Sequence, residues 1–305
     1  MYIKAISSLL VSLISLTTIA SPGYSSSINN LNSNNKPTKN DQAEYTNNFI
    51  EYSNDPISRY FRNVFTSKTH NGLSTKEYNW YFKPNNEGLT PMFPIEINKL
   101  ASKYDCYYVG DTSKKVLYLT FDEGYENGYT AQILDVLKKH NVKAAFFVVK
   151  PYITSNEELV KRMVDEGHIV CNHSARHPSM ASILDQDKFN KELSDVEGAF
   201  EQATGKKMAK YFRPPMGKYS ELSLNYTKAY GYKTIFWSFA YQDWEPKNQP
   251  SQEKGKTLIS KRTHNGAIVL LHAVSKTNAE ILDDVITNWE KEGYQIKSLN
   301  DMPNE

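Results

Sequence analysis

Three polar clusters in the sequence combine residue types that can bind a metal ion and transfer protons. Asp122 and Glu123 are adjacent carboxylates, His173 and His177 are four residues apart, and His272 lies near the carboxyl end of the chain. A carboxylate and two histidines can hold a divalent cation and leave coordination positions open for substrate. If residues 173–177 formed one helical turn, both imidazole rings would lie on one side. These residues therefore predict a metal site with open coordination positions.

Each cluster also has an ordinary structural interpretation. A histidine pair at this spacing is more often exposed or part of a core than a metal site. Adjacent acidic residues are common where a helix begins, because the helix dipole favours negative charge there. The metal interpretation gains weight because both clusters follow predicted strands. Two neighbouring side chains at a strand end diverge, so we expect one carboxylate to bind metal and the other to act as a base.

From Val116 onward, short apolar runs alternate with longer amphipathic stretches, and this alternation predicts the strands and helices that would position these residues. Short β-branched and aromatic runs predict strands at Val116–Phe121, Lys143–Val149, His168–Cys171, Tyr211–Phe212, Lys233–Trp237 and Ala267–Leu271. Longer amphipathic stretches predict helices near Asn127–His140, Asn156–Glu166, Gln186–Thr204, Glu221–Tyr230 and Lys276–Glu292. Such alternation predicts an α/β fold with a parallel sheet, either open or closed into a barrel. In both forms catalytic groups gather at the carboxyl ends of the strands, where the three clusters fall.

The amino-terminal part of the chain reads differently. Residues 1–20 carry one lysine and then an uncharged, mostly apolar run, which is typical of a signal peptide that is cleaved or kept as an anchor. Residues 21–46 are rich in Asn and Ser and predict a flexible linker. Residues 47–105 regain aromatic residues but are interrupted by Pro, Asn and Gly, so we expect an irregular extension packed on the catalytic domain, residues 106–302.

Composition and charge limit the classes of partner. The 36 basic and 34 acidic residues nearly balance, which gives no whole-chain attraction to nucleic acid. We expect contact with a membrane only through the signal segment. Cys106 and Cys171 are the only cysteines. Two thiols do not make a disulfide framework, so both are interpreted as buried small residues, with a single bridge left open.

Five short motifs resemble those of a known family, the polysaccharide deacetylases of carbohydrate esterase family 4, also called the NodB-homology family. They occur in the family's order as Thr120–Gly124 (TFDEG), Asn172–Pro178 (NHSARHP), Arg213–Gly217 (RPPMG), Asp243-Trp244 (DW) and Leu270–His272 (LLH). The resemblance spans about Asp105 to Asp301, close to two thirds of the chain. It implies a distorted (β/α) barrel of about seven parallel strands.

The resemblance also implies a role for each matched residue. Asp122 would be the general base and His272 the general acid, with Arg213 holding Asp122 and Asp243 holding His272. Glu123, His173 and His177 would bind a divalent metal, Zn²⁺ as first choice and Co²⁺, Mn²⁺ or Ni²⁺ as alternatives. Substrate would meet Pro214, the Met216 backbone N–H at the oxyanion, and an acetyl pocket walled by Trp244 and Leu270.

Two departures from the family pattern stand out. Glu123 occupies the metal-ligand position where most members have Asp, and Ala240 replaces another Asp of the fourth motif. The longer Glu123 side chain is expected to keep a metal but to alter its affinity or selectivity. The residues after His272, together with Glu126–Thr130 (ENGYT), resemble the branch of muramic-δ-lactam-forming deacetylases of spore-forming bacteria.

The resemblance, together with the signal-like segment, therefore implies an exported, monomeric, metal-dependent hydrolase acting on the peptidoglycan glycan strand. The expected substrate is N-acetylmuramic acid without its stem peptide, with a contribution to muramic-δ-lactam in the spore cortex. The site of action would be the cell wall or the spore intermembrane space. One alternative is an N-acetylglucosamine deacetylase of peptidoglycan or chitin oligomers. Another is a non-catalytic glycan-binding protein, which the intact acid and base residues disfavour.

Overall fold

The computed structural model describes residues 69–303 of the 305-residue chain. The predicted signal peptide, the linker and the first part of the extension, residues 1–68, lie outside the described residues. Two described strands near the start, β1 (Thr69–His70) and β2 (Leu73–Ser74), form a small antiparallel hairpin. The rest of the described extension leads into helix α4 (Ile95–Leu100).

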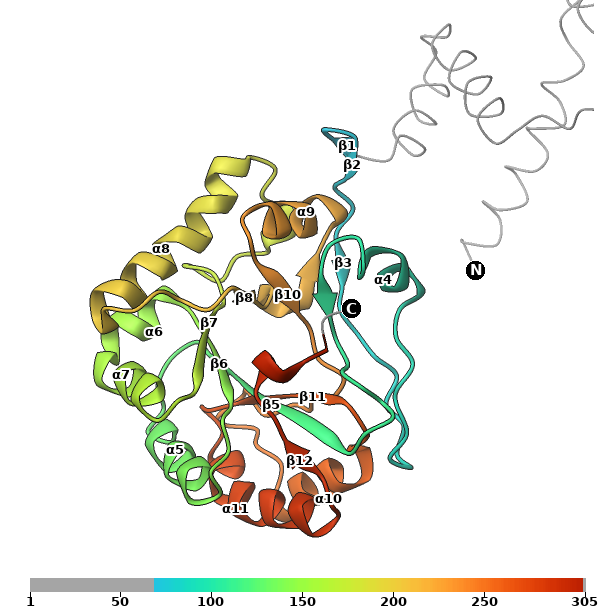
Figure 1. The fold of residues 1–305 in the computed structure, drawn as a ribbon, viewed down its shortest axis with the longest axis vertical. Coiled ribbons are helices and arrows are strands. Elements are labelled where there is room, and N and C mark those ends of the chain that lie inside the picture. Colours follow the sequence, from blue (N-terminus) through green and yellow to red (C-terminus); the bar gives the residue numbers. More distant parts are fainter. Residues whose placement is uncertain (1–68, 304–305) are drawn as a thin grey trace, which may run out of the picture. The chain divides into compact units, whose positions relative to one another are not determined.

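A curled parallel sheet forms the centre of the domain (Figure 1). Its strand order is β11-β5-β6-β7-β8-β10-β4, and β12 pairs with β5 outside this path. The eight strands are β4 (Cys106–Tyr107), β5 (Val116–Glu123), β6 (Ala145–Val148), β7 (Ile169–Asn172), β8 (Tyr211–Phe212), β10 (Lys233–Ile235), β11 (Ala267–His272) and β12 (Gln295–Ile296). Bridges from Val109 to Ala267 and from Phe239 to Val269 bring the two ends of this order together. The predicted distorted barrel is confirmed.

Helices surround the outside of the curled sheet (Figure 1). They are α5 (Thr130–Lys139), α6 (Lys150–Ser155), α7 (Glu157–Asp165), α8 (Gln186–Thr204), α9 (Glu221–Ala229), α10 (Gln252–Arg262) and α11 (Lys276–Lys291). Local sequence explains their limits. Asp185 caps α8 by accepting a hydrogen bond from the Lys188 N–H, and Gly205 ends it with a φ of 68°. The bounds predicted for this helix from the sequence are the observed ones.

Three described helices have no counterpart in the sequence prediction. Helix α4 lies in the extension, which was predicted to be irregular. Helix α6 has six residues, with Pro151 as the second, so it is too short to display a helical period. Helix α10 buries only Gly255 and Ile259, and the polar residues around them leave a weak apolar pattern. The predicted strand at Lys233–Trp237 ends earlier, at Ile235. The other predicted strands and helices are confirmed with shifts at their ends.

Alternation along β5 divides the core into two layers. Leu117, Leu119 and Phe121 pack outward in the cluster that includes residues of α5 and α11, whereas Val116 and Tyr118 pack in the barrel interior. Leu299 of the 3-10 helix η3 (Leu299–Asp301) joins the interior cluster near the amino ends of the strands. The next two residues on β5 follow the same alternation. Asp122 therefore belongs to the interior face and Glu123 to the outer face.

Strand β3 (Tyr78–Asn79) connects the extension to the domain, because it pairs antiparallel with β9 (Lys218–Tyr219). The indole of Trp80 follows β3 and is only 6% exposed. The described part of the extension therefore packs on the domain through β3 and Trp80. Cys106 and Cys171 are both buried and free, which confirms their interpretation as small buried residues.

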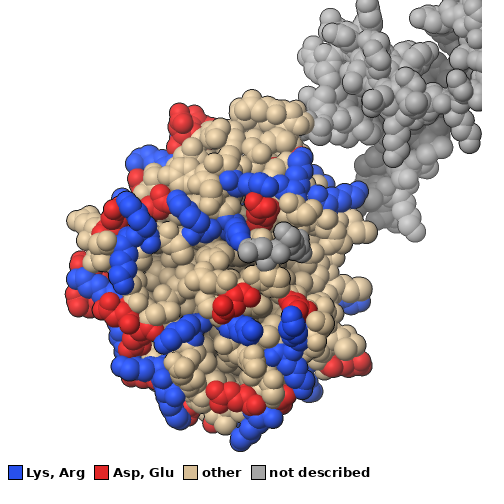
Figure 2. Space-filling model, in the orientation of Figure 1, with Lys and Arg blue, Asp and Glu red and all other residues tan. Residues whose placement is uncertain are grey.

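The surface seen in Figure 2 carries lysines and arginines interspersed with acidic residues, without an extended patch of one sign. This agrees with the balanced composition. Among residues 69–303, no helix has the length and apolar character needed to cross a membrane.

Candidate active site

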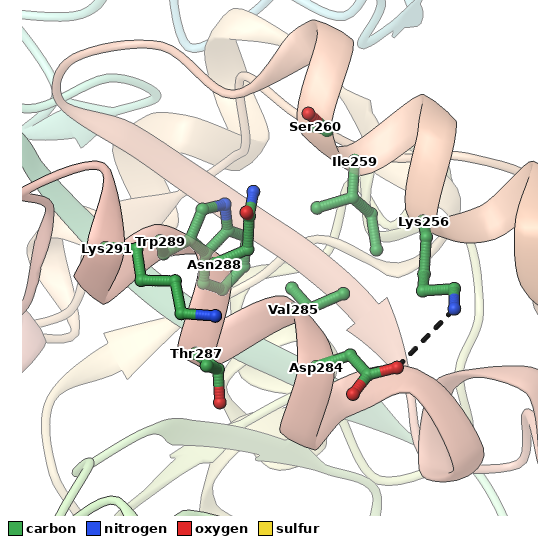
Figure 3. A pocket seen from close by; sticks show the side chains of 9 residues that line it. All are labelled: Lys256, Ile259, Ser260, Asp284, Val285, Thr287, Asn288, Trp289 and Lys291. Atoms are coloured by element: carbon green, nitrogen blue, oxygen red, sulfur yellow. Dashed lines mark hydrogen bonds and ion pairs between the residues drawn. The ribbon is translucent and has the colours of Figure 1, made fainter.

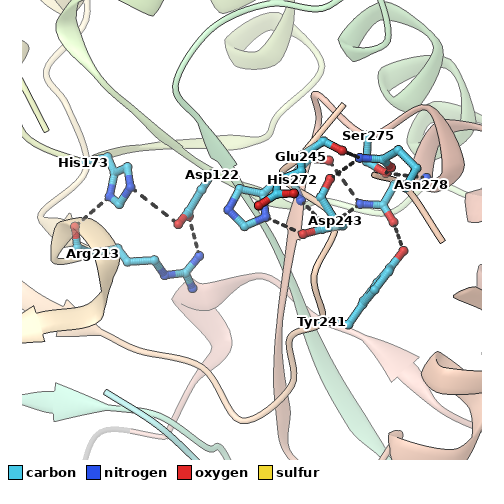
Figure 4. Close-up of polar contacts among 10 residues, drawn as sticks. Asp122, His173, Arg213, Tyr241, Asp243, Glu245, His272, Ser275 and Asn278 are labelled. Carbon is cyan, nitrogen blue, oxygen red and sulfur yellow. Dashed lines mark hydrogen bonds and ion pairs between the residues drawn. The ribbon is translucent and has the colours of Figure 1, made fainter. Parts of the chain in front are cut away.

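A surface hollow lies between α10 and α11, on the helical layer of the domain (Figure 3). Lys256 and Asp284 form an ion pair at its edge, with 3.4 Å between Nζ and Oδ2, and Ile259 and Val285 contribute apolar surface. The side chains that line this hollow include none of the predicted site residues. Figure 4 instead shows five of the predicted residues near the carboxyl ends of the parallel strands: Asp122, His173, Arg213, Asp243 and His272.

Asp122 is held by a buried guanidinium. Asp122 Oδ1 lies 2.7 Å from Arg213 Nη1, and the Arg213 side chain is completely buried. Arg213 itself is anchored by donating to the backbone carbonyls of Ile235 and Phe236. Burial alone would raise the pKa of Asp122, but the positive charge of Arg213, with smaller contributions from His173 and His272, lowers it. Asp122 is therefore an ionised carboxylate at neutral pH.

His272 is paired with a second buried carboxylate. Its Nδ1 donates to Asp243 Oδ1 at 2.7 Å, and its backbone N–H donates to Asp243 Oδ2 at 2.9 Å. This bond leaves Nε2 as the ring position from which a proton can be transferred. Burial opposes the charged form, but the charge and hydrogen bond of Asp243 outweigh it and raise the pKa of His272. The ring is thereby kept protonated further into the neutral range.

The base and the acid lie on neighbouring strands. Asp122 of β5 and His272 of β11 are direct partners in the parallel register, and both belong to the interior face. Adjacent strands are about 4.8 Å apart, so the two side chains flank one small space. Figure 4 shows Asp122 with His173 and Arg213 on one side and His272 with Asp243 on the other.

His173 and His177 also lie together, although not on a helix. Their ring centroids are 4.9 Å apart, and the segment between them is a loop in which Ser174 and His177 have φ values of 70° and 58°. The helical turn expected from their spacing is therefore wrong, and a left-handed loop brings the rings together instead. His173 Nδ1 donates to the Arg213 carbonyl at 2.8 Å, which leaves Nε2 unprotonated and 3.5 Å from Asp122 Oδ2. Burial lowers the pKa of His173 to about 4.

Glu123 does not join the two histidines. Its side chain is completely buried, and neither carboxylate oxygen has a hydrogen-bond partner within the described residues. Burial and the nearby charges of Glu126 and Asp122 raise its pKa well above the ordinary value. The negative charge of Asp122 acts to raise the pKa of both His173 and His177, whereas Glu123 contributes to neither. The reason is the alternation along β5, which places residue 123 on the face opposite Asp122.

The metal-ligand set predicted from the sequence is therefore incomplete in this arrangement. Across residues 69–303, no three His, Cys, Asp or Glu side chains are grouped closely enough to hold a metal ion. His173 and His177 suit a cation by ring proximity and by the free Nε2 of His173. Glu123 does not fit as their third partner.

Two of the predicted substrate-binding residues, Trp244 and Leu270, lie close to His272, and the other two, Pro214 and Met216, follow Arg213 in the chain. The ring of Trp244 packs edge-on to the His272 ring at 5.7 Å and remains 49% exposed. Leu270 is buried two residues before His272 on the same face of β11. Pro214 opens the 3-10 helix η2 (Pro215–Gly217), in which Met216 has a φ of 58° and an exposed side chain.

Two residues that support the acid were not predicted as site residues. Asn278 Nδ2 donates to Asp243 Oδ2 at 2.6 Å and to the His272 carbonyl at 3.1 Å, and Tyr241 donates to Asn278 Oδ1. This network fixes the carboxylate that orients the imidazole. Asn278 was visible in the sequence only as part of the branch pattern after His272. Tyr241 carried no signal beyond its position two residues before Asp243.

Comparison with known proteins identifies the family of this chain. The polysaccharide deacetylase family model matches residues 109–235. The peptidoglycan-N-acetylmuramic acid deacetylase PdaA of Bacillus subtilis is 46% identical over 224 residues, which cover 73% of this chain and 85% of that protein. The solved structure of PdaA, described as a family 4 carbohydrate esterase, superposes with a TM-score of 0.73 and covers 75% of this chain and 98% of that one.

Two relatives of lower sequence identity are also similar to this chain. The peptidoglycan-N-acetylglucosamine deacetylase PgdA of Listeria monocytogenes is 36% identical, over 63% of this chain and 39% of that protein. A family 4 pseudoenzyme from Bacillus anthracis is 30% identical, with a TM-score of 0.60 and coverage of 65% of this chain and 68% of that one. The protein therefore belongs to the polysaccharide deacetylase family and is a hydrolase of N-acetyl amide bonds on carbohydrate.

Proposed function

We propose that this protein removes the acetyl group from N-acetylmuramic acid of peptidoglycan whose stem peptide is absent. It would thereby contribute to muramic-δ-lactam formation in the spore cortex. The observation that carries the chemistry is the register pairing of Asp122 with His272, each held by its own buried partner, Arg213 and Asp243. The substrate assignment is supported by similarity to the muramic acid deacetylase of Bacillus subtilis.

The proposed reaction uses the two sides of this pair in turn. Asp122 takes a proton from a water molecule, whose oxygen attacks the acetyl carbonyl carbon. The Met216 backbone N–H stabilises the negative oxygen of the tetrahedral intermediate. His272 then gives its proton to the sugar nitrogen while the carbon–nitrogen bond breaks, releasing acetate and the free amine. Trp244 and Leu270 would enclose the acetyl methyl group.

We also propose that a divalent cation, with zinc as first choice, binds at His173 and His177. Support comes from the neighbouring rings and from the free Nε2 of His173, which the Arg213 carbonyl orients. When bound, such a cation polarises an acetyl carbonyl or activates water. Glu123 is not included in this ligand set, because it lies on the outer face of β5.

The proposed place of action is outside the cytoplasm, in the cell wall or the spore intermembrane space. Its support is the peptidoglycan substrate of the relatives and the signal-like composition of residues 1–20.

The deciding experiment compares acetate release from three substrates: peptide-free muramic glycan, intact muropeptides and N-acetylglucosamine oligomers. It is run on chelated protein with single metals added back. We expect release from the peptide-free glycan at least tenfold above the other two. Release from N-acetylglucosamine oligomers alone would assign the protein to that substrate class. Release from none of the three with any metal would indicate a binding protein on the same fold.

A further inference from the structure

One carboxylate of the extension touches two loops that carry predicted site residues. Glu77 Oε2 accepts a hydrogen bond from the Ser179 hydroxyl at 2.5 Å, and Glu77 Oε1 lies 2.9 Å from Lys218 Nζ. Ser179 follows His177 by two residues, and Lys218 follows Met216 by two. Glu77 therefore connects the histidine loop, residues 173–179, to the oxyanion loop, residues 213–218.

The backbone next to Glu77 is held against the oxyanion loop. Strand β3 pairs with β9, and beyond it the Trp80 N–H donates to the Gly217 carbonyl at 2.7 Å. The Trp80 indole donates to the Trp237 carbonyl at 3.0 Å. Gly217 has a φ of 65°, and a Cβ built there would lie 2.9 Å from Trp80 Cβ. Trp80 thus packs directly against the Gly217 backbone. Because these contacts hold the backbone near Glu77 in place, the Glu77 side chain is positioned to contact both loops.

Both loops contain backbone that needs support. Ser174, His177 and Met216 all have positive φ values although none is glycine. Residues with a Cβ atom occupy this region at a cost and stay there only where surrounding contacts hold them. The Glu77 contacts supply such support, because Ser179 and Lys218 each lie two residues after a strained residue, His177 and Met216.

Global stability does not explain the Glu77 contacts. The Glu77 and Lys218 side chains are 35% and 32% exposed, and ion pairs this exposed contribute little to folding. The hydrogen bonds from Ser179 and Lys218 together lower the pKa of Glu77, so the carboxylate stays charged while it contacts both. Its effect is therefore expected on local geometry.

We propose that Glu77 is a positioning residue of the active site, which sets the histidine loop against the oxyanion loop by holding Ser179 and Lys218 at once. It would fix the His177 ring and the Met216 N–H relative to Asp122 without touching substrate. The inference rests on the proposed deacetylation, since these are the groups which that reaction uses. It also makes the described part of the extension, residues 69–105, a part of the catalytic unit.

Kinetics of three variants test the proposal. Glu77→Ala removes both contacts, Glu77→Gln keeps an oxygen that can accept from Ser179, and Glu87→Ala is the matched control because Glu87 is an exposed glutamate of the same extension. We expect Glu77→Ala to lower kcat about tenfold while KM stays within about twofold, since misplaced catalytic groups slow the chemical step. The kcat of Glu77→Gln should lie between those of Glu77→Ala and wild type, and the kcat of Glu87→Ala should equal that of wild type.

Amide hydrogen exchange gives a second readout that needs no substrate. In Glu77→Ala, peptides covering residues 173–179 and 213–218 should exchange faster, while peptides of β5 and β11 should be unchanged. If Glu77→Ala shows the faster exchange but the wild-type protein releases no acetate, the positioning role is supported and the proposed deacetylation is refuted. Unchanged exchange in both loops, or a kcat for Glu77→Ala equal to that of Glu87→Ala, would overturn the proposal. If Glu77→Ala does not fold, Glu77→Gln decides by the same two readouts.

Discussion

Asp122 and Glu123 are neighbours on one strand and are both buried, yet their environments are opposite. Asp122 faces the barrel interior, where Arg213 and His173 contact it, and its pKa is lowered. Glu123 faces the outer layer, where its oxygens have no hydrogen-bond partner among the described residues, and its pKa is raised. Burial therefore does not decide the charge of a carboxyl group. The face of the strand decides it, because the face determines which cations are near.

The strongest test of this contrast removes the ionised member. Asp122→Asn keeps the shape of the side chain but cannot take a proton from water. We expect acetate release to fall by about 10²- to 10⁴-fold, the range that general bases contribute. The measurement is the single-turnover rate of acetate release, with circular dichroism to confirm folding. Release within threefold of wild type would remove Asp122 from the role of base.

A second test concerns the buried carboxylate on the acid side. Asp243 raises the pKa of His272, so His272 stays protonated to a higher pH than burial alone would allow. In Asp243→Asn that support is lost and burial lowers the pKa of His272. The basic limb of the kcat/KM profile should therefore move to lower pH, with about 10²-fold less activity at neutral pH.

Glu245→Gln serves as its control, because Glu245 is an exposed carboxylate two residues away in the same loop. A basic limb that stays in place in Asp243→Asn would show that another group sets it.

The smallest expected effect belongs to Glu123. A carboxyl group whose pKa is raised on folding contributes stability at low pH, and this stability is lost as pH rises from the unfolded value of about 4.3 toward the folded one. Glu123→Gln cannot ionise, so it should be more stable than wild type at pH 8, by roughly 1–3 kcal/mol, and nearly equal at pH 4. Urea unfolding across this range measures the difference.

The same variant sharpens the question of metal ligands. Cobalt affinity measured by calorimetry should change less than about twofold in Glu123→Gln, whereas His173→Gln should lose at least tenfold. A comparable loss in both variants would place Glu123 among the ligands.

Much of the fold could be predicted because its signals are local. The alternation of short apolar runs with amphipathic stretches identified the parallel sheet, and Asp185 with Gly205 marked both ends of α8. Where local signals were weak, the prediction failed, as for the polar helix α10 and the short helix α6. The expected helical turn from His173 to His177 failed for another reason, since equal spacing is also produced by a loop with two left-handed residues.

Residue types and their order along the chain determined which groups form the candidate site, because most of the predicted residues lie at or just after the carboxyl end of a parallel strand. What only the tertiary structure decided is which of them meet. Asp122 and His272 come together through strand register across about 150 residues of chain, and Glu77 reaches both active-site loops through a strand of the extension. Glu123 does not meet its expected partners because consecutive residues of a strand point to opposite faces, and Glu123 is on the face opposite Asp122. Pairing between distant segments depends on packing of the whole domain, which no local pattern encodes.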